Sequence, residues 1–206
     1  MTDNQIPEIV VGRLPQYLRS LQRMAREGRT LTSSQELGER LGISAAQIRK
    51  DLSQFGEFGK QGTGYQIAYL IEQLQKILNV DHEWDMAVVG AGDMGSAVAR
   101  YRGFMDRGFK VCMIFDINPE KIGEQVGDFI IQDYGRLVEI IRAAGIKVAM
   151  ITVPANQAQE VADRLVEAGI TAILNYAPIS INVPEEVRVQ YIDPAIHLQR
   201  MTFYLK

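Results

Sequence analysis

A short apolar run that ends in a glycine-rich turn constrains this chain more than any other feature. Residues 86–89 (Met-Ala-Val-Val) predict a buried strand, and Gly-Ala-Gly-Asp-Met-Gly follows at residues 90–95. A helical stretch then continues through Tyr101 and Met105. A strand, a G-x-G-x-x-G turn and a helix in this order are typical of the first βα unit of a dinucleotide-binding Rossmann domain.

Each glycine of this turn has its own physical task. Gly90 permits the tight turn, Gly92 lets a pyrophosphate approach the backbone, and Gly95 lets the helix pack closely on the strand. The N–H groups and the dipole at the helix N-terminus favour phosphate groups. We therefore expect the whole turn to bind the cofactor: Gly90, Ala91, Gly92, Asp93, Met94 and Gly95.

A second predicted strand, residues 110–115, ends in Asp116, twenty-one residues after Gly95. A carboxylate there accepts hydrogen bonds from both ribose hydroxyls and repels a 2′-phosphate, so NAD(H) is favoured over NADP(H). No arginine follows immediately to reverse that preference. We add Lys121 to the candidate cofactor-binding residues. The alternative is a glycine-rich turn in some other α/β domain.

The alternation of strands and helices continues towards the C-terminus. We predict strands near 129–131, 148–153 and 170–174 and helices at 134–144 and 156–168, which together imply a doubly wound parallel sheet. Ligands of such sheets lie at the carboxyl ends of the strands. Two segments there are expected beside the nicotinamide, unless Pro154, Asn175 and Pro178 only shape loops: Val153, Pro154, Asn175, Tyr176, Ala177 and Pro178.

The first eighty residues have a different pattern, that of several short helices. Apolar spacing predicts a helix at 13–27, and Ser-x-x-Glu at 33–36 and Ser-x-x-Gln at 44–47 are capping boxes that start two more. A glycine turn at 41–43 joins these two, as in a helix-turn-helix. Arginine and glutamine suit base edges, and lysine and serine suit phosphates. The candidate DNA-binding residues are Ser44, Gln47, Arg49, Lys50, Ser53 and Lys60.

Lys60 belongs to a glycine-rich segment, residues 55–65, with aromatic residues at both ends. We expect a β-hairpin wing with Lys60 at its tip, followed by a helix at 66–79 and a polar hinge at 79–83. The alternative is a small helical dimerisation domain with a flexible connector.

The charge balance and the small numbers of cysteine and histidine limit which functions are possible. Residues 1–80 hold ten Lys and Arg against eight Asp and Glu, whereas the remainder holds twelve against seventeen, so a polyanion partner suits the first part. A single cysteine and two histidines exclude a disulfide framework and a Cys/His zinc site. No apolar run approaches the ~18 residues of a membrane span, and the start lacks a secretory signal, so we expect a cytoplasmic protein.

The last segment predicts a helix capped by Asp193, with Pro194 in its first turn. Its apolar residues occupy more than one face, which requires a partner surface. A homodimer is the economical way to supply that surface.

Several of these motifs together resemble the Rex family of redox-sensing repressors. They are Gln-Ile-Arg-Lys-Asp-Leu-Ser at 47–53, Phe-Gly at 55–56, Gly-Lys at 59–60, Gly-Thr-Gly-Tyr at 62–65, Val-Gly-Ala-Gly at 89–92 and Leu-Asn-Tyr-Ala-Pro at 174–178. The resemblance implies a winged-helix DNA-binding domain at 1–80, a Rossmann NAD(H)-binding domain at 84–192, and a C-terminal helix at 193–206 exchanged between the subunits of a dimer. Gln61 and Pro194 depart from residues common in that family.

The resemblance also implies a function: a repressor that binds double-stranded operator DNA as a dimer and is released by NADH. It places Arg19, Tyr101 and Asp193 near the junction of domains and subunits, where Asp193 is expected to exchange partners between the other two. The simpler alternative is that Asp193 only caps its helix. A small NAD-dependent dehydrogenase is the alternative function, but His82 in the hinge and His197 on the terminal helix offer no placed acid or base.

Overall fold

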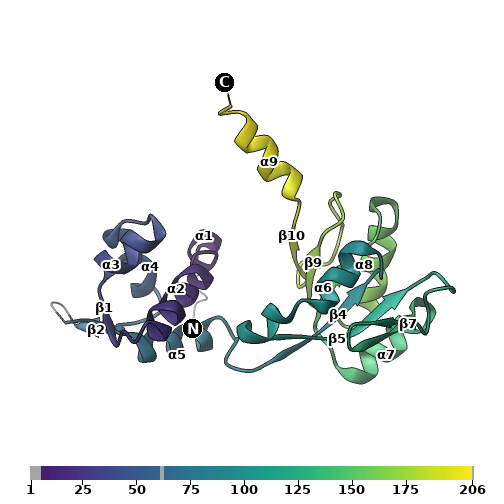
Figure 1. Cartoon of the computed structure of the whole chain (residues 1–206), viewed down its shortest axis with the longest axis horizontal. Coiled ribbons are helices and arrows are strands. Elements are labelled where there is room, and N and C mark those ends of the chain that lie inside the picture. The colour runs from purple at the N-terminus through teal and green to yellow at the C-terminus, as the bar shows by residue number, and fades with distance from the viewer. Residues whose placement is uncertain (1–5, 61–62, 206) are drawn as a thin grey trace. The chain divides into compact units, whose positions relative to one another are not determined.

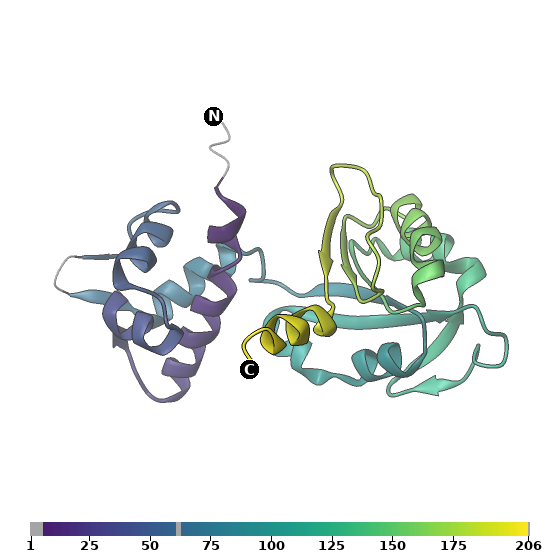
Figure 2. The same cartoon turned by 90° about the horizontal axis from the view of Figure 1, so that it is seen from above.

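The computed structural model of the chain describes residues 6–60 and 63–205. The chain divides into two compact units, one ending at His82 and the other beginning at Glu83. The two units can be followed in Figures 1 and 2. Over the described residues, every helix is too short or too polar to cross a lipid bilayer.

The first unit combines helices with a small antiparallel sheet. Its helices are α1 (Glu8–Val11), α2 (Leu14–Arg26), α3 (Ser34–Leu41), α4 (Ala45–Ser53) and α5 (Ile67–Ile77). Its strands lie in the order β1 (Leu31–Thr32), β3 (Gly64–Gln66) and β2 (Gly59–Lys60). The four longer helices bury their apolar faces in one core. Helices α3 and α4 with this sheet form the predicted winged helix-turn-helix.

Serine caps begin both helices of the helix-turn-helix, as predicted. Ser33 Oγ accepts from the backbone N–H of Glu36 at 3.1 Å, and Ser44 Oγ accepts from that of Gln47 at 3.2 Å. In a capping box, Glu36 and Gln47 would also accept from the backbone N–H of the cap serine. Here their side chains bond elsewhere, Glu36 with Arg29 and Thr32 and Gln47 with Asp51. Gly42, whose φ of 68° is in the left-handed region that glycine adopts without strain, ends α3.

The glycine-rich segment forms a hairpin rather than a flexible connector. Strands β2 and β3 pair antiparallel, with Gly59 opposite Tyr65 and Lys60 opposite Gly64. Gln61, one of the two departures from the family pattern, lies outside the described residues.

The second unit is a doubly wound sheet whose strands lie in the order β10-β9-β8-β4-β5-β7-β6. The strands are β4 (Trp84–Val89), β5 (Phe109–Asp116), β6 (Gln125–Val126), β7 (Phe129–Asp133), β8 (Val148–Ile151), β9 (Ala172–Asn175) and β10 (Arg188–Tyr191). All neighbours are parallel except β6 and β7. Without β6, this is the strand order of a Rossmann sheet.

Helices cover both faces of this sheet (Figure 1). They are α6 (Asp93–Arg100), α7 (Leu137–Ala144) and α8 (Ala158–Glu167), with 3₁₀ turns η1 (Arg102–Arg107), η2 (Tyr134–Arg136) and η3 (Ala155–Gln157). The strand order reverses between β4 and β8, so a crevice opens at the carboxyl ends of these two strands.

The structure corrects several predicted bounds. The helix after the glycine turn ends at Arg100 rather than near Met105, because Tyr101 adopts an extended backbone and η1 follows. Strands β6 and β10 and helix α1 were not predicted. All three elements are short. Strand β10 also lies at the sheet edge with its residues exposed or half-buried, so it lacks the apolar pattern of a central strand.

Helix α9 (Pro194–Thr202) follows β10 and has no buried residue. Its predicted cap is confirmed, since Asp193 Oδ1 accepts from the N–H of Ala195 at 2.9 Å. Large apolar side chains on and after this helix are more than half exposed: Ile196, Leu198, Met201, Phe203, Tyr204 and Leu205.

Candidate functional site

The glycine turn has the geometry that its sequence predicts. Gly90 has a φ of 101°, and a Cβ there would lie 2.8 Å from the carbonyl oxygen of Thr152. A Cβ on Gly95 would clash with the carbonyl oxygen of Gly90, so only a glycine permits helix and strand to approach this closely. A Cβ on Gly92 would meet no atom within 4 Å. The space beside the middle glycine is therefore open, as the predicted approach of a pyrophosphate requires.

Asp116, at the end of β5, is tied to this turn. Its Oδ2 accepts from the N–H of Ala91 at 2.7 Å, and its Oδ1 accepts from the N–H of Asn118 at 2.8 Å. Lys121 Nζ donates to the carbonyl oxygen of Ala91 at 3.2 Å and lies 3.8 Å from Asp116 Oδ2. A carboxylate oxygen accepts more than one hydrogen bond, so Asp116 can still accept from ribose hydroxyls.

A pocket of about 350 Å³ opens beside these residues. Of the predicted cofactor-binding residues, it brings together Gly90, Gly92, Asp116, Lys121, Val153 and Pro154. The pocket wall also includes residues that the sequence analysis missed: Val89, Ile117, Tyr134, Thr152, Gln157, Glu160 and Val161. Thr152 Oγ1 lies 2.9 Å from the carbonyl oxygens of Val89 and Gly90, so it holds the turn against β8.

The missed residues had a usable signal. Thr152 lies within the predicted strand 148–153 near its end, Tyr134 directly follows the observed strand β7, and Ile117 follows Asp116 directly. Position alone marks such residues, because every strand of a parallel sheet ends at the same edge.

The other predicted residues do not line this pocket. Ala91, Asp93, Met94 and Gly95 lie in the turn or at the start of α6. Asn175 is fully buried, its Oδ1 accepts from the N–H of Ala177, and its Nδ2 donates to the carbonyl oxygen of Ile179. These bonds favour the alternative that Asn175 shapes the loop 175–178. In that loop Tyr176 is half-buried, Ala177 is buried and Pro178 is exposed.

In the first unit, α4 carries four of the six predicted DNA-binding residues, Ser44 is its N-cap, and Lys60 lies on β2. Arg49, Lys50 and Ser53 are exposed. Arg49 Nη1 donates to Ser34 Oγ at 2.9 Å, across the two helices of the helix-turn-helix, and Ser53 Oγ donates to the carbonyl oxygen of Lys50. Gln47 is half-buried and donates to Asp51 at 2.6 Å, so its amide is already engaged.

Asp51 anchors α4 to α2 and was not predicted as a functional residue. It is fully buried and accepts from Arg13 Nε and Nη2 at 2.6 and 2.8 Å and from the Tyr17 hydroxyl at 2.6 Å. Burial alone would raise the pKa of Asp51, but the hydrogen bonds from Arg13, Tyr17 and Gln47 outweigh it and lower that pKa. The sequence signal was a carboxylate beside Ile48 and Leu52 on the apolar face of a helix.

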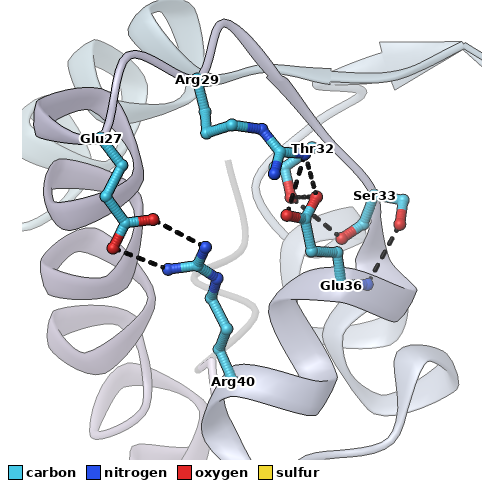
Figure 3. A network of polar contacts seen from close by, with 6 residues as sticks. All are labelled: Glu27, Arg29, Thr32, Ser33, Glu36 and Arg40. Atoms are coloured by element: carbon cyan, nitrogen blue, oxygen red, sulfur yellow. Dashed lines mark hydrogen bonds and ion pairs between the residues drawn. The ribbon is translucent and has the colours of Figure 1, made fainter.

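A second polar network fixes the start of the helix-turn-helix (Figure 3). Arg40 donates to both carboxylate oxygens of Glu27, at 3.2 and 2.7 Å, and so joins α3 to the end of α2. Arg29 and Thr32 both donate to Glu36, in the first turn of α3. Both ion pairs are partly exposed, so their contribution to stability is small. The Arg40–Glu27 pair ties α3 to the end of α2, and the Arg29–Glu36 pair ties α3 to the segment before β1.

Of the three predicted coupling residues, Arg19 lies in the first unit, and Tyr101 and Asp193 both lie in the second. Arg19 is exposed on α2 of the first unit. Tyr101 is half exposed in the second unit, where its ring packs edge-to-face on Phe104 with 4.9 Å between centroids. Asp193 caps α9. The exchange of Asp193 between Arg19 and Tyr101 stays a prediction.

These features define a class of protein, a transcriptional regulator in which a winged helix-turn-helix unit is joined to a Rossmann unit. The family model described as "Putative DNA-binding protein N-terminus" matches residues 5–53, and that described as "CoA binding domain" matches residues 81–179.

Full-length relatives identify the family. The chain is 54% identical to the redox-sensing transcriptional repressor Rex of Chloroflexus aurantiacus, over 97% of this chain and 94% of that protein. It is 45% identical to the Rex repressor of Brevibacillus brevis, over 98% and 97%. The chain therefore belongs to the Rex family of redox-sensing transcriptional repressors. Its relatives are named as repressors, so the dehydrogenase alternative is not favoured.

Solved structures agree with this assignment. A crystal structure of RSP in complex with beta-NAD+ and operator DNA matches with a TM-score of 0.93 at 38% identity, covering 97% of this chain and 92% of that one. A structure of RSP in complex with beta-NADH matches with a TM-score of 0.89 at 35% identity, covering 98% and 95%. The predicted fold class is confirmed.

Proposed function

We propose that this protein is a dimeric transcriptional repressor that binds operator DNA and leaves it when NADH binds. The observation that carries the proposal is the presence, in one chain, of an anchored helix with exposed cations and a glycine-turn pocket with a carboxylate at its edge. The solved relatives with NAD+ and operator DNA and with NADH support both ligands. The protein is proposed to act in the cytoplasm, where such operator DNA lies.

The DNA site is assigned to residues 1–80. Arg49 contacts base edges in the major groove, where its guanidinium can bond bidentately to a guanine. Lys50, Ser53 and Ser44 contact phosphates from α4 and its cap, and Lys60 does so from the wing. Gln47 reaches a base only if its bond to Asp51 opens, because that bond now uses its amide N–H.

The NAD(H) site is assigned to residues 84–192. The pyrophosphate lies over Gly92 at the start of α6, with the N–H groups of that helix as donors. Asp116 accepts from the ribose hydroxyls, with Lys121 beside it. Val153 and Pro154 then border the far side of the pocket, and the loop 175–178, shaped by Asn175, lies towards the nicotinamide.

The exposed α9, residues 193–206, is proposed to be exchanged between the two subunits of the dimer. Its apolar side chains then close the partner's nicotinamide site and remove water from it. A dry site penalises the cationic ring of NAD+ more than the neutral ring of NADH. Closure rotates the Rossmann units, and the winged helices lose the half-site spacing of roughly 34–36 Å that B-DNA requires.

Asp193 is proposed to couple the two sites by exchanging partners between Arg19 and Tyr101 across the dimer. A residue that only caps α9 has no such effect. The Arg19→Ala variant separates the two roles, because the switch predicts a changed ratio of NADH affinities with and without DNA, by a coupling of about 1–3 kcal/mol. An unchanged ratio would leave Arg19 out of the mechanism.

The experiment that tests the function measures binding to the protein's own promoter region while NADH is titrated against fixed NAD+. We expect binding to fall as NADH rises, and an NADH-insensitive complex would contradict the proposal. Arg49→Ala is expected to abolish specific binding. Lys60→Ala is the matched control, expected to weaken binding to all sequences equally and to reduce the salt slope by about 1.

A further inference from the structure

Arg49, the residue proposed to contact base edges, is bonded to the neighbouring helix of the helix-turn-helix. Its Nη1 donates to Ser34 Oγ at 2.9 Å, although Arg49 is exposed and the two residues are 15 positions apart. Ser34 is the first residue of α3 and was not among the predicted DNA-binding residues. Fixing a long exposed side chain costs rotamer entropy, so a bond that orders Arg49 in the free protein calls for a physical reason.

Both ends of this bond lie on anchored backbone. Four hydrogen bonds to the buried Asp51 hold α4 in place. At the start of α3, Ser33 caps the helix and Glu36 is bonded to two side chains outside it (Figure 3). The distance between the backbones of Arg49 and Ser34 is therefore set by the fold, and the bond between their side chains fixes the direction of the guanidinium.

The chemistry of the partner leaves Arg49 able to bind DNA. Other arginines of the same unit pair with carboxylates, which compensate their charge: Arg13, Arg29 and Arg40. Arg49 donates instead to a neutral hydroxyl, through one of the five N–H donors of a guanidinium. The bond does not use the edge formed by Nε and Nη2, with which Arg13 binds both oxygens of Asp51. Such an edge can bond bidentately to a guanine.

A third element, the wing, also lies near Arg49. Tyr65 on β3 is opposite Thr32 in the small sheet, two residues before Ser34. Its ring packs on Gly59, where a Cβ would lie 2.9 Å from Cδ1 of the ring. Burial raises the pKa of the Tyr65 hydroxyl, and the positive charge of Arg49 counteracts part of that rise. Arg49 is thus near both α3 and the wing as well as its own helix.

We propose that Ser34 is a positioning residue for base recognition, whose hydroxyl holds Arg49 in its DNA-reading direction before DNA binds. Nη1 stays on Ser34 while the edge formed by Nε and Nη2 bonds to a base. A side chain that is already ordered loses less freedom on binding, so the operator is bound more tightly. Phosphate contacts do not depend on the direction of Arg49, so the gain is confined to the correct sequence. The inference rests on the proposed role of Arg49 at a base edge.

The test measures the affinity of full-length Ser34→Ala for a duplex from the protein's own promoter region and for a scrambled duplex of the same length and composition. The ratio of the two affinities should fall roughly twofold to tenfold, the loss expected when one long side chain must be ordered on binding. Affinity for the scrambled duplex and the salt slope should stay at the wild-type values. The melting temperature should not change, because Ser33 still caps α3.

Three further variants separate positioning from other roles. Ser34→Thr keeps a hydroxyl and should restore the wild-type ratio. Gln35→Ala removes the next, exposed side chain of α3 and should leave the ratio unchanged. In an Arg49→Ala background, Ser34→Ala should change neither affinity, because no guanidinium is left to position.

The alternative role for Ser34 is direct contact with a phosphate. Equal losses on both duplexes that persist in the Arg49→Ala background would assign that role and overturn the proposal. A wild-type ratio in Ser34→Ala, a loss that Ser34→Thr does not restore, or a matching loss in Gln35→Ala would also overturn it. If Arg49→Ala itself keeps the wild-type ratio, the proposed DNA site fails and this inference fails with it.

Discussion

Asp51 in the winged-helix unit and Tyr134 in the Rossmann unit are both buried polar residues, yet they differ in how they are satisfied. Asp51 accepts four hydrogen bonds, two from Arg13 and one each from Tyr17 and Gln47. Tyr134 has an unpaired hydroxyl among the described residues. The first arrangement is complete without any ligand, whereas the second leaves hydrogen-bonding capacity beside a pocket.

The Asp51 cluster positions a helix, whereas the glycine-turn pocket is available to bind a ligand. A fully satisfied buried cluster fixes one orientation of α4, so the exposed Arg49 and Lys50 project from a rigid element. The glycine-turn pocket has open space beside Gly92, and the buried Tyr134 hydroxyl at its wall has no partner among the described residues. Substitutions in the first cluster should therefore disturb folding, and substitutions in the pocket should disturb binding alone.

Asp51→Ala is expected to have the largest effect. It leaves the buried Tyr17 hydroxyl and the Arg13 guanidinium without their acceptor, and breaking such a pair is unfavourable by about 3–5 kcal/mol. Arg13 is partly exposed, so we expect the lower end of that range. Chemical unfolding and operator titration should show a destabilised first unit with little DNA binding, while NADH still binds. Asp106→Ala, at an exposed site on η1, is the control. Wild-type operator affinity in Asp51→Ala would contradict the anchor.

The same cluster makes the first unit sensitive to both acid and base. Asp51 has a lowered pKa, so its stabilisation is present above the unfolded value of about 3.9 and disappears as the pH falls through the lower folded value. Burial raises the pKa of Tyr17 to about 12, so its stabilisation is complete below about 10 and is lost between the two values. Unfolding free energies measured across these ranges should fall at both ends. In Asp51→Asn the unfolding free energy should fall less steeply at low pH. An equally steep fall would show that other groups cause the loss of stability in acid.

The glycine turn offers a direct contrast between folding and binding. Gly95→Ala brings a Cβ into a clash with the carbonyl oxygen of Gly90 and should destabilise the second unit by about 1–3 kcal/mol. Gly92→Val adds a side chain where a Cβ meets no protein atom. It should melt like wild type and bind DNA without responding to NADH. An intact NADH response in Gly92→Val would refute the assignment of the pyrophosphate to this turn.

Asp116→Ala should give a smaller effect, on cofactor choice. Removing the carboxylate takes away the repulsion of a 2′-phosphate and leaves Lys121, whose Nζ is 3.8 Å from Asp116 Oδ2, as an attractive cation. The preference for NADH over NADPH should fall by roughly tenfold, as measured by titration of both. Adding Lys121→Ala should return part of the preference. A preference unchanged in both variants would place the ribose elsewhere.

Local patterns in the sequence predicted the parts of the molecule that are themselves local. Ser33, Ser44 and Asp193 cap helices through bonds that span two or three residues, and Gly90 to Gly95 form a turn set by backbone geometry. The doubly wound parallel sheet followed from the repeated βα units, because such connections have one handedness.

Contacts between distant segments were beyond this kind of prediction. Asp51 meets Arg13 across 38 residues, and nothing near either residue specifies the other. Tyr134 reaches the pocket from the connection after β7, whereas Thr152 and Glu160 reach it from the segment that follows β8. Gln47 was predicted to contact DNA, but its side chain bonds to the buried Asp51. The sequence does not predict this bond, because it depends on how deeply α4 packs.

The most direct test of the account measures the affinity for NADH in the absence and presence of saturating operator DNA. If NADH and operator DNA oppose each other's binding, DNA must weaken NADH binding by the same factor by which NADH weakens DNA binding, because coupling is reciprocal. We expect that factor to be about 5–150, the usual range for coupled sites. An NADH affinity that operator DNA leaves unchanged would contradict the claim that the two units form one redox-responsive repressor.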